Sequence, residues 1–350
     1  MYLYRASWVV ATGVLLAAAT TSAVAQNSLP GYRLESRRRL GGDGGWDYLA
    51  FDTVGHRLFI ARQNRVMVVN PSDGKVLGEI TGLDGAHGIA FVYETGHGFI
   101  TSGRDSTVTM FDLETLHVLG KTTAGVDADA ILYDPASKRV FTFNGDARSS
   151  TVINPVSGKR IGSIDLGAEP EFGVSAGNGK LYVNLTKKGT VVEIDAVAMR
   201  ITRQWSVAPC QSSTGLAIDR STHRLFSVCR NKIMAISDVT HGRLITTLPI
   251  GGGVDAAVFD PRTHNVFSSN GDGTLTVVHE DSRDHFSVTQ TVPTMAGART
   301  MALNPSTHKI YLVTAEFGPP PAESTATNRH RRPPILPGSF TLLVVGSGIR

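Results

Sequence analysis

Short apolar runs recur along the chain at an almost constant spacing, and each is followed by turn-forming residues. The last residue of each run serves here as an anchor, and the seven anchors are Asp52, Val92, Asp134, Ala176, Asp219, Asp260 and Asn304. Successive anchors are separated by 40, 42, 42, 43, 41 and 44 residues. A period of about 42 residues is the size of one four-stranded propeller blade.

Every unit repeats the same order of elements. A turn such as VGHR or RSTHR follows the anchor, and then come a strand such as LFIA or LFSV, a polar loop, a third strand such as TVVEID and a fourth such as VLGEI. Alternating or short β-rich runs bounded by turn residues are typical of hairpins. The period is too long for a parallel β-helix, and the copies are too many for a two-sheet sandwich. The sequence therefore predicts an all-β fold, a seven-bladed propeller of four-stranded antiparallel blades over residues 32–350.

The two ends of this region are predicted to meet. Tyr32–Leu40 reads as a strand with no partner before it, while the last unit reaches only a third strand at Phe340–Val345. We expect the N-terminal strand to become the fourth strand of the last blade, because this closes the ring and removes free sheet edges.

One strand carries a resemblance to a known family. The segment LYVNL at Leu181–Leu185, and more loosely LFIAR and IYLVT, resembles the repeat of the YVTN or YncE-like β-propeller family. The resemblance extends over about Gly41 to Val345 and implies an exported or surface propeller. It implies no single activity, because one fold supports many functions.

The N-terminus has the pattern of a secretory signal. Arg5 precedes an apolar run of 12 residues, Trp8–Ala19, which is too short to span a bilayer, and Ala23-Val24-Ala25 supplies a small-x-small cleavage site. We expect residues 1–25 to be removed, a retained anchor being the alternative. The processed protein is then expected in the periplasm or outside the cell, without a membrane span and where disulfides persist.

Charge and cysteine content narrow the possible functions. The net charge of +4 falls to +3 without Arg5, which is too small an excess to indicate nucleic-acid binding. Cys210 precedes the first strand of unit five and Cys229 ends the second, so both lie at the same end of one hairpin. We predict a disulfide between them rather than a redox role, since no C-x-x-C motif occurs. A monomer is expected.

In a propeller, the first strand of each blade lines the central channel. The first residue of that strand is therefore a candidate binding residue. Five positions before the anchors lie Asp47, His87, Asp129, Glu171, Thr214, Asp255 and Arg299. All seven are polar, which apolar packing does not require. Two further acids, Asp127 and Glu169, precede this ring in their loops. We expect an acidic funnel for a small ligand or protein partner; the alternative is that strand starts are polar because they emerge into water.

The chemistry expected of the funnel depends on its carboxylates. Asp47, His87, Asp129 and Asp255 would suit a divalent cation such as Ca²⁺, and the same acids would suit a cationic or polyhydroxyl ligand. Crowded carboxylates raise one another's pKa, so that one of them is suited to act as a general acid or base.

Loops between second and third strands supply an outer rim to the same face. Arg62, Arg104 and Arg230 lie there as candidate partners of carboxylates or phosphates, with solvated loop charge as the alternative. An insertion at 317–338 is Pro-rich and carries Arg329, His330, Arg331 and Arg332; it suggests a lid, a docking segment or a passive linker. On the opposite face, turn histidines at positions 56, 97, 223, 264 and 308 are interpreted as repeat chemistry, not as a metal site.

The leading functional prediction is an exported binding or scaffold protein that uses the funnel. One alternative is a metal-assisted hydrolase or lyase of lactone- or sugar-like substrates, and another is a non-catalytic subunit of a periplasmic redox complex. The sequence contains no G-x-S-x-G, H-E-x-x-H or Walker A motif.

Overall fold

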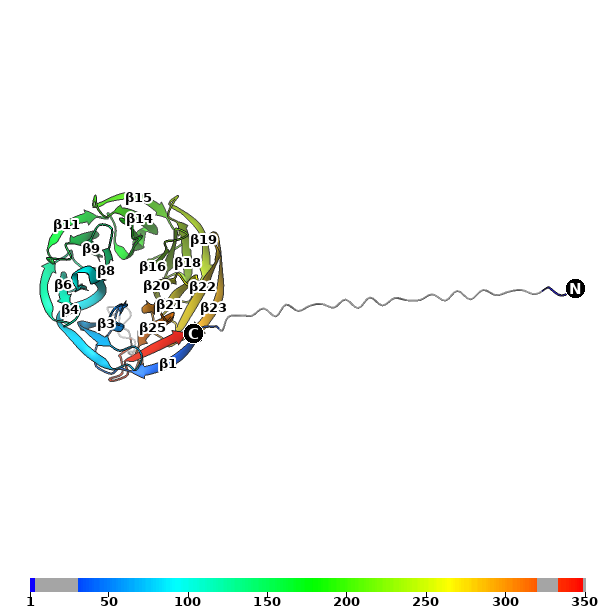
Figure 1. Ribbon diagram of the computed structural model, residues 1–350, viewed down its shortest axis with the longest axis horizontal. Helices are drawn as coiled ribbons and strands as arrows, with labels where there is room; N and C mark the ends of the chain where they lie inside the picture. The colour runs from blue at the N-terminus through cyan, green and yellow to red at the C-terminus, as the bar shows by residue number, and fades with distance from the viewer. Residues whose placement is uncertain (4–30, 320–332, 349–350) are drawn as a thin grey trace, which may run out of the picture.

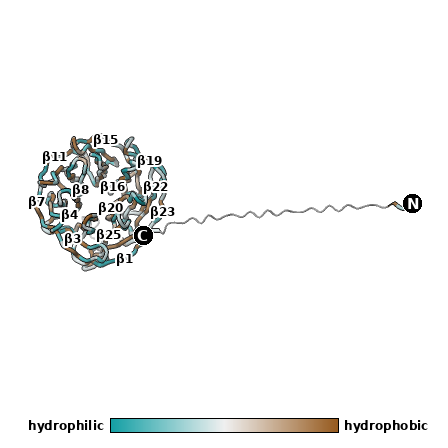
Figure 2. Tube along the Cα trace, viewed as in Figure 1, coloured by the Kyte–Doolittle hydropathy of each residue, from teal (hydrophilic) through white to brown (hydrophobic). Residues whose placement is uncertain are grey.

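The computed structural model describes residues 1–3, 31–319 and 333–348, and in these residues the chain forms a ring of β-sheets around a central channel (Figure 1). Apolar and polar segments alternate along the tube all the way round the ring (Figure 2). Apart from Met1–Leu3, the expected signal segment lies outside the described residues, and so does the basic cluster at 329–332.

Five sheets have four antiparallel strands each. Their strands are β8 (Ala128–Asp134), β9 (Arg139–Asn144), β10 (Ser149–Ile153) and β11 (Arg160–Asp165); β12 (Pro170–Ser175), β13 (Lys180–Leu185), β14 (Thr190–Asp195) and β15 (Arg200–Ser206); β16 (Ser213–Asp219), β17 (Arg224–Cys229), β18 (Ile233–Asp238) and β19 (Arg243–Pro249); β20 (Val254–Asp260), β21 (Asn265–Asn270), β22 (Thr274–Ser282) and β23 (His285–Pro293); and β24 (Met301–Asn304), β25 (Lys309–Thr314), β26 (Thr341–Gly346) and β1 (Arg33–Arg39).

A sixth sheet has six strands. It contains β2 (Leu49–Asp52), β3 (Arg57–Val69), β4 (Val76–Val92), β5 (His97–Ser102), β6 (Thr107–Asp112) and β7 (Val118–Thr123). Two single-turn 3₁₀ helices, η1 (Tyr93–Thr95) and η2 (Thr186–Lys188), lie in turns.

The prediction of seven blades is therefore wrong: counted by its sheets, the propeller has six. The difference arises in the first two sequence units, which share one continuous ladder. β4 pairs with β3 through its first half and with β5 through its second half, so it serves as an outer strand of unit one and the inner strand of unit two. Phe59 of β3 and Phe111 of β6 belong to one buried cluster of this sheet, with ring centroids 5.9 Å apart.

The ring closes through the N-terminal strand, as the sequence predicts. β1 pairs antiparallel with β26, and Arg33 lies opposite Gly346 while Arg39 lies opposite Thr341. The first and last described strands therefore belong to the same sheet. This arrangement leaves no unpaired strand at the junction of the ring.

The hydrophobic core lies between adjacent sheets. Phe141 and Val183 belong to one buried cluster that joins two neighbouring sheets, and Phe226 and Val266 belong to another. Burial of such side chains is the main favourable contribution to folding.

The anchor aspartates hold the first turns and also reach the next unit. Asp134 accepts a hydrogen bond from the Ser137 amide at 2.8 Å and another from the Ser175 hydroxyl of β12 at 2.6 Å. Asp260 similarly pairs with His308 at 2.8 Å. These aspartates are part of the fold, at the end of the strands away from the site described next.

Candidate functional site

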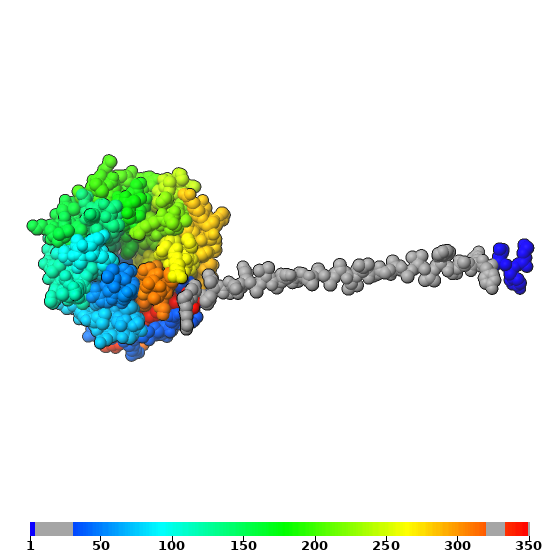
Figure 3. All heavy atoms as spheres, viewed as in Figure 1, coloured from blue at the N-terminus to red at the C-terminus, as the bar shows by residue number. Residues whose placement is uncertain are grey.

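A cavity of about 680 Å³ opens where the first strands of the sheets begin. Its lining is polar on the channel side and apolar on one lip, and consists of Gly45, Trp46, Asp47, Tyr48, His87, Asp129, Glu171, Arg230, Gly253, Val254, Asp255, Gly271, Gly297, Arg299, Phe317, Pro333 and Ile335. Cavities of this size hold small organic ligands. The space-filling view shows the ring hollowed at its centre (Figure 3).

Six of the seven predicted ring residues line this cavity, and local backbone geometry explains why. In the first strand of five successive sequence units, the pairing register shifts by one residue at the ring position, as at His87, Asp129 and Asp255. Such a β-bulge redirects a side chain that regular pleating would turn elsewhere. At His87, Asp129, Glu171 and Asp255, the bulged residue lines the cavity.

Hydroxyl groups from neighbouring strands hold the backbone of the ring. Thr101 of β5 donates to the carbonyl of Asp129, and Ser269 of β21 donates to the carbonyl of Arg299. Thr300 donates to the carbonyl of Asp47 at 2.8 Å. These contacts link sequence-distant parts of the ring and fix the side chains that enter the cavity.

Ion pairs inside the cavity reduce its expected acidity. His87 hydrogen bonds through Nδ1 to Asp47, and the same nitrogen lies 3.4 Å from Asp129. Across the cavity, Arg299 donates to Asp255 at 2.6 Å. The cavity therefore places paired charges of both signs beside one another, instead of the negative funnel that the sequence predicts.

The protonation states follow from these contacts. Burial opposes a charge on His87, but the hydrogen bond and the charge of Asp47, with smaller effects of Asp129 and Asp127, raise its pKa to about 9. Burial and the charge of Asp47 raise the pKa of Asp129 well above its ordinary value, although His87 opposes this. Burial and Asp255 raise the pKa of Glu171 to about 7. At neutral pH, His87 is therefore protonated, and Glu171 is near the midpoint of its titration.

Tyr48 is a cavity residue that the sequence reasoning misses. Its side chain is only 8% exposed, its ring packs on Phe172 at 5.3 Å between centroids, and burial followed by the charges of Asp129 and Asp255 raises its pKa well above the usual value. Among the described residues, none forms a hydrogen bond with its hydroxyl group. The repeat analysis fixes one ring position per unit, so a second inward residue in unit one carries no periodic signal.

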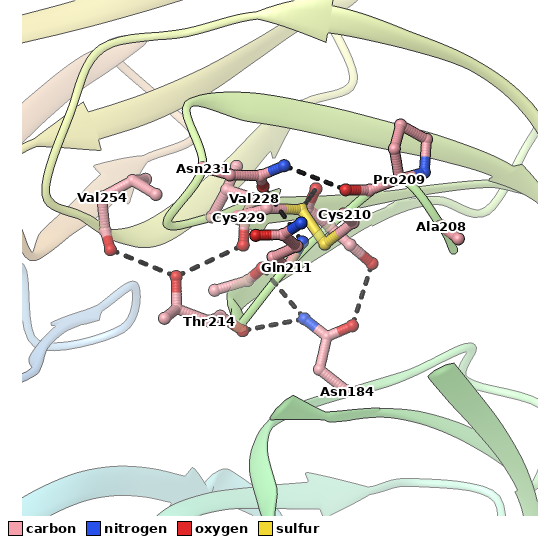
Figure 4. Close-up of a disulfide and its surroundings, with 12 residues drawn as sticks. Asn184, Ala208, Pro209, Cys210, Gln211, Thr214, Val228, Cys229, Asn231 and Val254 are labelled. Carbon is pink, nitrogen blue, oxygen red and sulfur yellow. Dashed lines mark hydrogen bonds between the residues drawn. A yellow bond between two sulfur atoms is a disulfide. The ribbon is translucent and has the colours of Figure 1, made fainter. Parts of the chain in front are cut away.

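Thr214, the seventh ring residue, is not part of the cavity surface. It is fully buried, and its hydroxyl donates to the carbonyls of Val228 and Val254 at 3.3 and 3.2 Å. Asn184 donates to the Thr214 carbonyl at 2.8 Å, which completes the network in Figure 4. A threonine at the ring position thus fastens neighbouring sheets together, and the expectation that it faces a ligand is wrong.

The predicted disulfide lies beside this network (Figure 4). Cys210 and Cys229 are bonded, with Cα atoms 5.6 Å apart, across the entrance to β16 and the end of β17. Asn231 reinforces the same loop by donating to the Pro209 carbonyl at 2.9 Å.

Arg62 is not a rim residue, which corrects a second expectation. It lies within β3 and is completely buried, and it donates to the carbonyls of Asp43, Gly44 and Gly45 at 2.9 to 3.1 Å. Its guanidinium also lies 3.5 Å from the ring centroid of Phe340. Arg62 therefore holds the loop that leads to Asp47 and has no donor free for a ligand.

The remaining predicted residues divide between the cavity and its surroundings. Arg230 lines the cavity, whereas Asp127 does not line it but is close enough for its charge to raise the pKa of His87. Glu169 pairs with Lys187 outside the lining. Arg104 is exposed and lies 3.7 Å from Asp84.

Three of the four proposed metal ligands come together. Asp47, His87 and Asp129 each present a donor atom within 4.8 Å of the others, whereas Asp255 lies outside this group and is held by Arg299. Cation binding at these three residues would require His87 to give up the proton that its carboxylate neighbours stabilise.

The base of the insertion forms the apolar lip of the cavity. Phe317 and Ile335 form an isolated bridge, and Gly318 donates to the Pro334 carbonyl at 2.8 Å. Phe317 also packs against Trp46, with ring centroids 6.1 Å apart. The described ends of the insertion are therefore fixed against the cavity.

The variant Glu171→Gln is expected to be more stable than the wild type at pH 8. The pKa of Glu171 in the folded protein is raised from 4.5 to about 7, so folding favours the neutral carboxyl over the charged one. The stability that protonation contributes is fully present below pH 4.5 and is lost as the pH rises through 7. Removing the charge should therefore stabilise the protein by about 1–3 kcal/mol at pH 8 and change little at pH 4. Urea unfolding at both pH values measures the difference.

The matched control is Glu169→Gln, which changes a neighbouring carboxylate that pairs with Lys187 outside the cavity lining. It should change stability at pH 8 by less than Glu171→Gln does, because the charge of Glu169 makes only a smaller contribution to the raised pKa of Glu171. A loss of stability in Glu171→Gln at pH 8 would instead show that the carboxylate makes a favourable structural interaction.

Within the described ranges, no helix has the length and apolar character needed to cross a membrane. No protein-family model and no curated protein sequence matches the chain, so the resemblance to the YVTN family is not confirmed.

Solved structures with a similar fold do exist. They include hydrazine synthase of Kuenenia stuttgartiensis, with 16% identity, a TM-score of 0.67 and coverage of 76% of this chain and 91% of that chain. A chain of the mitotic checkpoint complex shows 13% identity, a TM-score of 0.68 and coverage of 87% of this chain and 95% of that chain. At these identities, the comparisons show that the chain has the β-propeller fold and show nothing finer.

Proposed function

We propose that this protein binds a small polar ligand in the cavity at the mouth of the propeller channel. The observation that carries the proposal is the Asp129 carboxylate in the cavity, whose Oδ1 is buried and makes no hydrogen bond. Tyr48 adds a second group, because it lines the cavity and its hydroxyl has no hydrogen-bond partner among the described residues. Unpaired polar groups at a buried site are costly, so a ligand that satisfies them gains affinity.

The lining indicates the chemistry of the ligand. Asp129 and Glu171 accept hydrogen bonds when ionised, and Arg230 offers a cation on the same cavity. Trp46 and Phe317 form an apolar lip that would cover a ring or short chain. We therefore propose a ligand with hydroxyl or amino groups on one side and an apolar face on the other.

Export is part of the same proposal. The disulfide between Cys210 and Cys229 is compatible with an oxidising compartment, and residues 1–25 have the pattern of a cleaved signal. The YVTN-like strand LYVNL also favours an exported propeller, as the family resemblance implies. A protein partner at the same face is a coarser form of the proposal, and the complex named for one similar structure, the mitotic checkpoint complex, is compatible with it.

Thermal-shift screening of polar small molecules should find compounds that stabilise the wild type. The variant Tyr48→Phe, which keeps the ring and its contact with Phe172, should respond to the same compounds by a smaller shift. Loss of one hydrogen bond to a buried ligand weakens affinity by roughly tenfold, which corresponds to about 1.4 kcal/mol.

The control variant is Tyr93→Phe, which alters a tyrosine whose hydroxyl bonds to Thr53 away from the cavity. It should retain the wild-type response. Identical responses in all three proteins would contradict the role of Tyr48, and conversion of a bound compound to product would favour the hydrolase or lyase alternative.

A further inference from the structure

A second group of metal-binding side chains lies at the opposite end of the strands from the cavity. Asp219 ends β16, His264 occupies the turn after β20, and Glu280 lies near the end of β22. Donor atoms of the three residues all lie within 4.8 Å of one another. They come from two neighbouring sheets, so any ligand that they share would connect those sheets.

Glu280 occupies a position at which the repeat elsewhere uses an apolar residue. Its amide donates to the His264 carbonyl at 2.9 Å, and the corresponding bonds elsewhere run from Leu113 to Gly96 at 2.9 Å, from Ala196 to Gly179 at 2.8 Å and from Val239 to His223 at 3.2 Å. Leu113, Ala196 and Val239 are all buried. The fold itself therefore does not require a carboxylate here.

The carboxylate of Glu280 is also left without the partners that a buried charge needs. The residue is 5% exposed, and neither of its side-chain oxygens makes a hydrogen bond of standard geometry. Asp219 beside it is 2% exposed and accepts from the hydroxyls of Ser221 and Thr222 at 2.8 and 2.7 Å. Two adjacent buried carboxylates repel each other unless a proton or a cation lies between them.

Arg224, a buried arginine nearby, does not serve as the counter-charge of the Glu280 carboxylate. The charge of Arg224 reaches Glu280, but its guanidinium is taken up by Asp238 at 3.2 Å and Asp284 at 2.7 Å. The next unit provides an informative contrast, because Asp260 and His308 pair at 2.8 Å and no second carboxylate among the described residues joins them. An aspartate and a turn histidine thus form an ordinary contact there, and Glu280 is what distinguishes this group.

We propose that Asp219, His264 and Glu280 form a binding site for a divalent transition-metal ion of the zinc class. Two carboxylates balance the charge of such an ion, and a donor set of one imidazole nitrogen and carboxylate oxygens is typical of zinc, whereas calcium prefers oxygen alone. His264 is exposed, which gives the ion a route from solvent. Three protein ligands leave a position for water, and the bound ion joins the two sheets. The assignment of all turn histidines to repeat chemistry is thereby revised for His264.

Zinc binding to untagged, chelator-treated protein tests the proposal. Isothermal titration and thermal shift with ZnCl₂ should reveal one site that His264→Ala weakens by at least about tenfold, since even indirect ligand partners contribute that much. Glu280→Leu should abolish the zinc response and raise the melting temperature of the metal-free protein, because leucine is what the repeat uses at Leu113.

Two controls separate this site from other sources of zinc binding. His56→Ala removes an exposed turn histidine from the first sequence unit and should retain the site. Asp47→Asn alters the cavity cluster and should also retain it. Zinc binding that survives Glu280→Leu, or that is lost only in Asp47→Asn, would overturn the proposal. A different outcome is that neither the wild type nor Glu280→Leu responds to zinc and that the metal-free Glu280→Leu protein is the less stable of the two. This result would overturn the metal site and show that Asp219 and Glu280 share a proton instead.

Discussion

Replacing Arg62 with Ala is expected to lower the free energy of unfolding by about 3 kcal/mol and to remove the cavity's ligand response. The guanidinium is completely buried, donates to the carbonyls of Asp43, Gly44 and Gly45 and packs on Phe340. Hydrogen bonds from a charged group contribute about 1.5–3 kcal/mol each, and hydration of the half-exposed loop carbonyls reduces the sum. Urea unfolding and thermal shift with a stabilising compound measure the two effects.

Arg65→Ala is the matched control, because Arg65 lies on the same strand but pairs with Glu79 near the surface at 2.9 Å and makes a single exposed hydrogen bond to the loop, to the Asp43 carbonyl at 3.2 Å. We expect it to change stability by less than about 1 kcal/mol and to leave ligand binding intact. Equal effects of the two substitutions would contradict the anchoring role of Arg62.

Loss of the disulfide is expected to lower the free energy of unfolding by about 3 kcal/mol. Cys210 and Cys229 are separated by 19 residues, and the bond removes conformational entropy from an unfolded loop of that length. Replacing both cysteines with Ala avoids placing new hydroxyl groups in the apolar cluster that surrounds them. Urea unfolding of the double variant should match that of the wild type under reducing conditions.

Asn231→Ala serves as the control for this loop. It removes the hydrogen bond to the Pro209 carbonyl and the one accepted from the Gln211 amide but leaves the disulfide, so the expected loss is about 1–2 kcal/mol. A double cysteine variant that is as stable as the wild type would show that the hydrogen-bonded network, with Thr214 and Asn184, holds the hairpin alone.

The repeat pattern predicts most of the fold because each unit buries the same apolar positions. It predicts the closing strand and the disulfide correctly, since both follow from strand order. It fails on the number of blades because hydrogen bonding continues through β4, and no sequence pattern distinguishes a continuous strand from two strands joined at a turn. Local ladder geometry depends on the final packing of the ring.

The same reasoning locates most of the cavity but not the role of each residue. Counting from the anchors finds Asp129 and Glu171 because each β-bulge occurs at the same position of its unit. It cannot distinguish Thr214, whose hydroxyl finds buried carbonyls, from residues that face the cavity. Nor does it identify Tyr48, because most other units have a small residue at the equivalent position, such as Gly88 and Ala130.

Native mass spectrometry of the protein purified from its own exported fraction tests the central claim most directly. The account predicts a chain that begins at Gln26, together with a bound species of roughly a few hundred daltons, which is the size that a cavity of 680 Å³ accepts. The bound species should be lost from the double variant Asp129→Asn, Glu171→Gln while the fold is retained. A wild-type protein that carries no additional mass, or a double variant that retains it fully, would contradict ligand binding in the cavity.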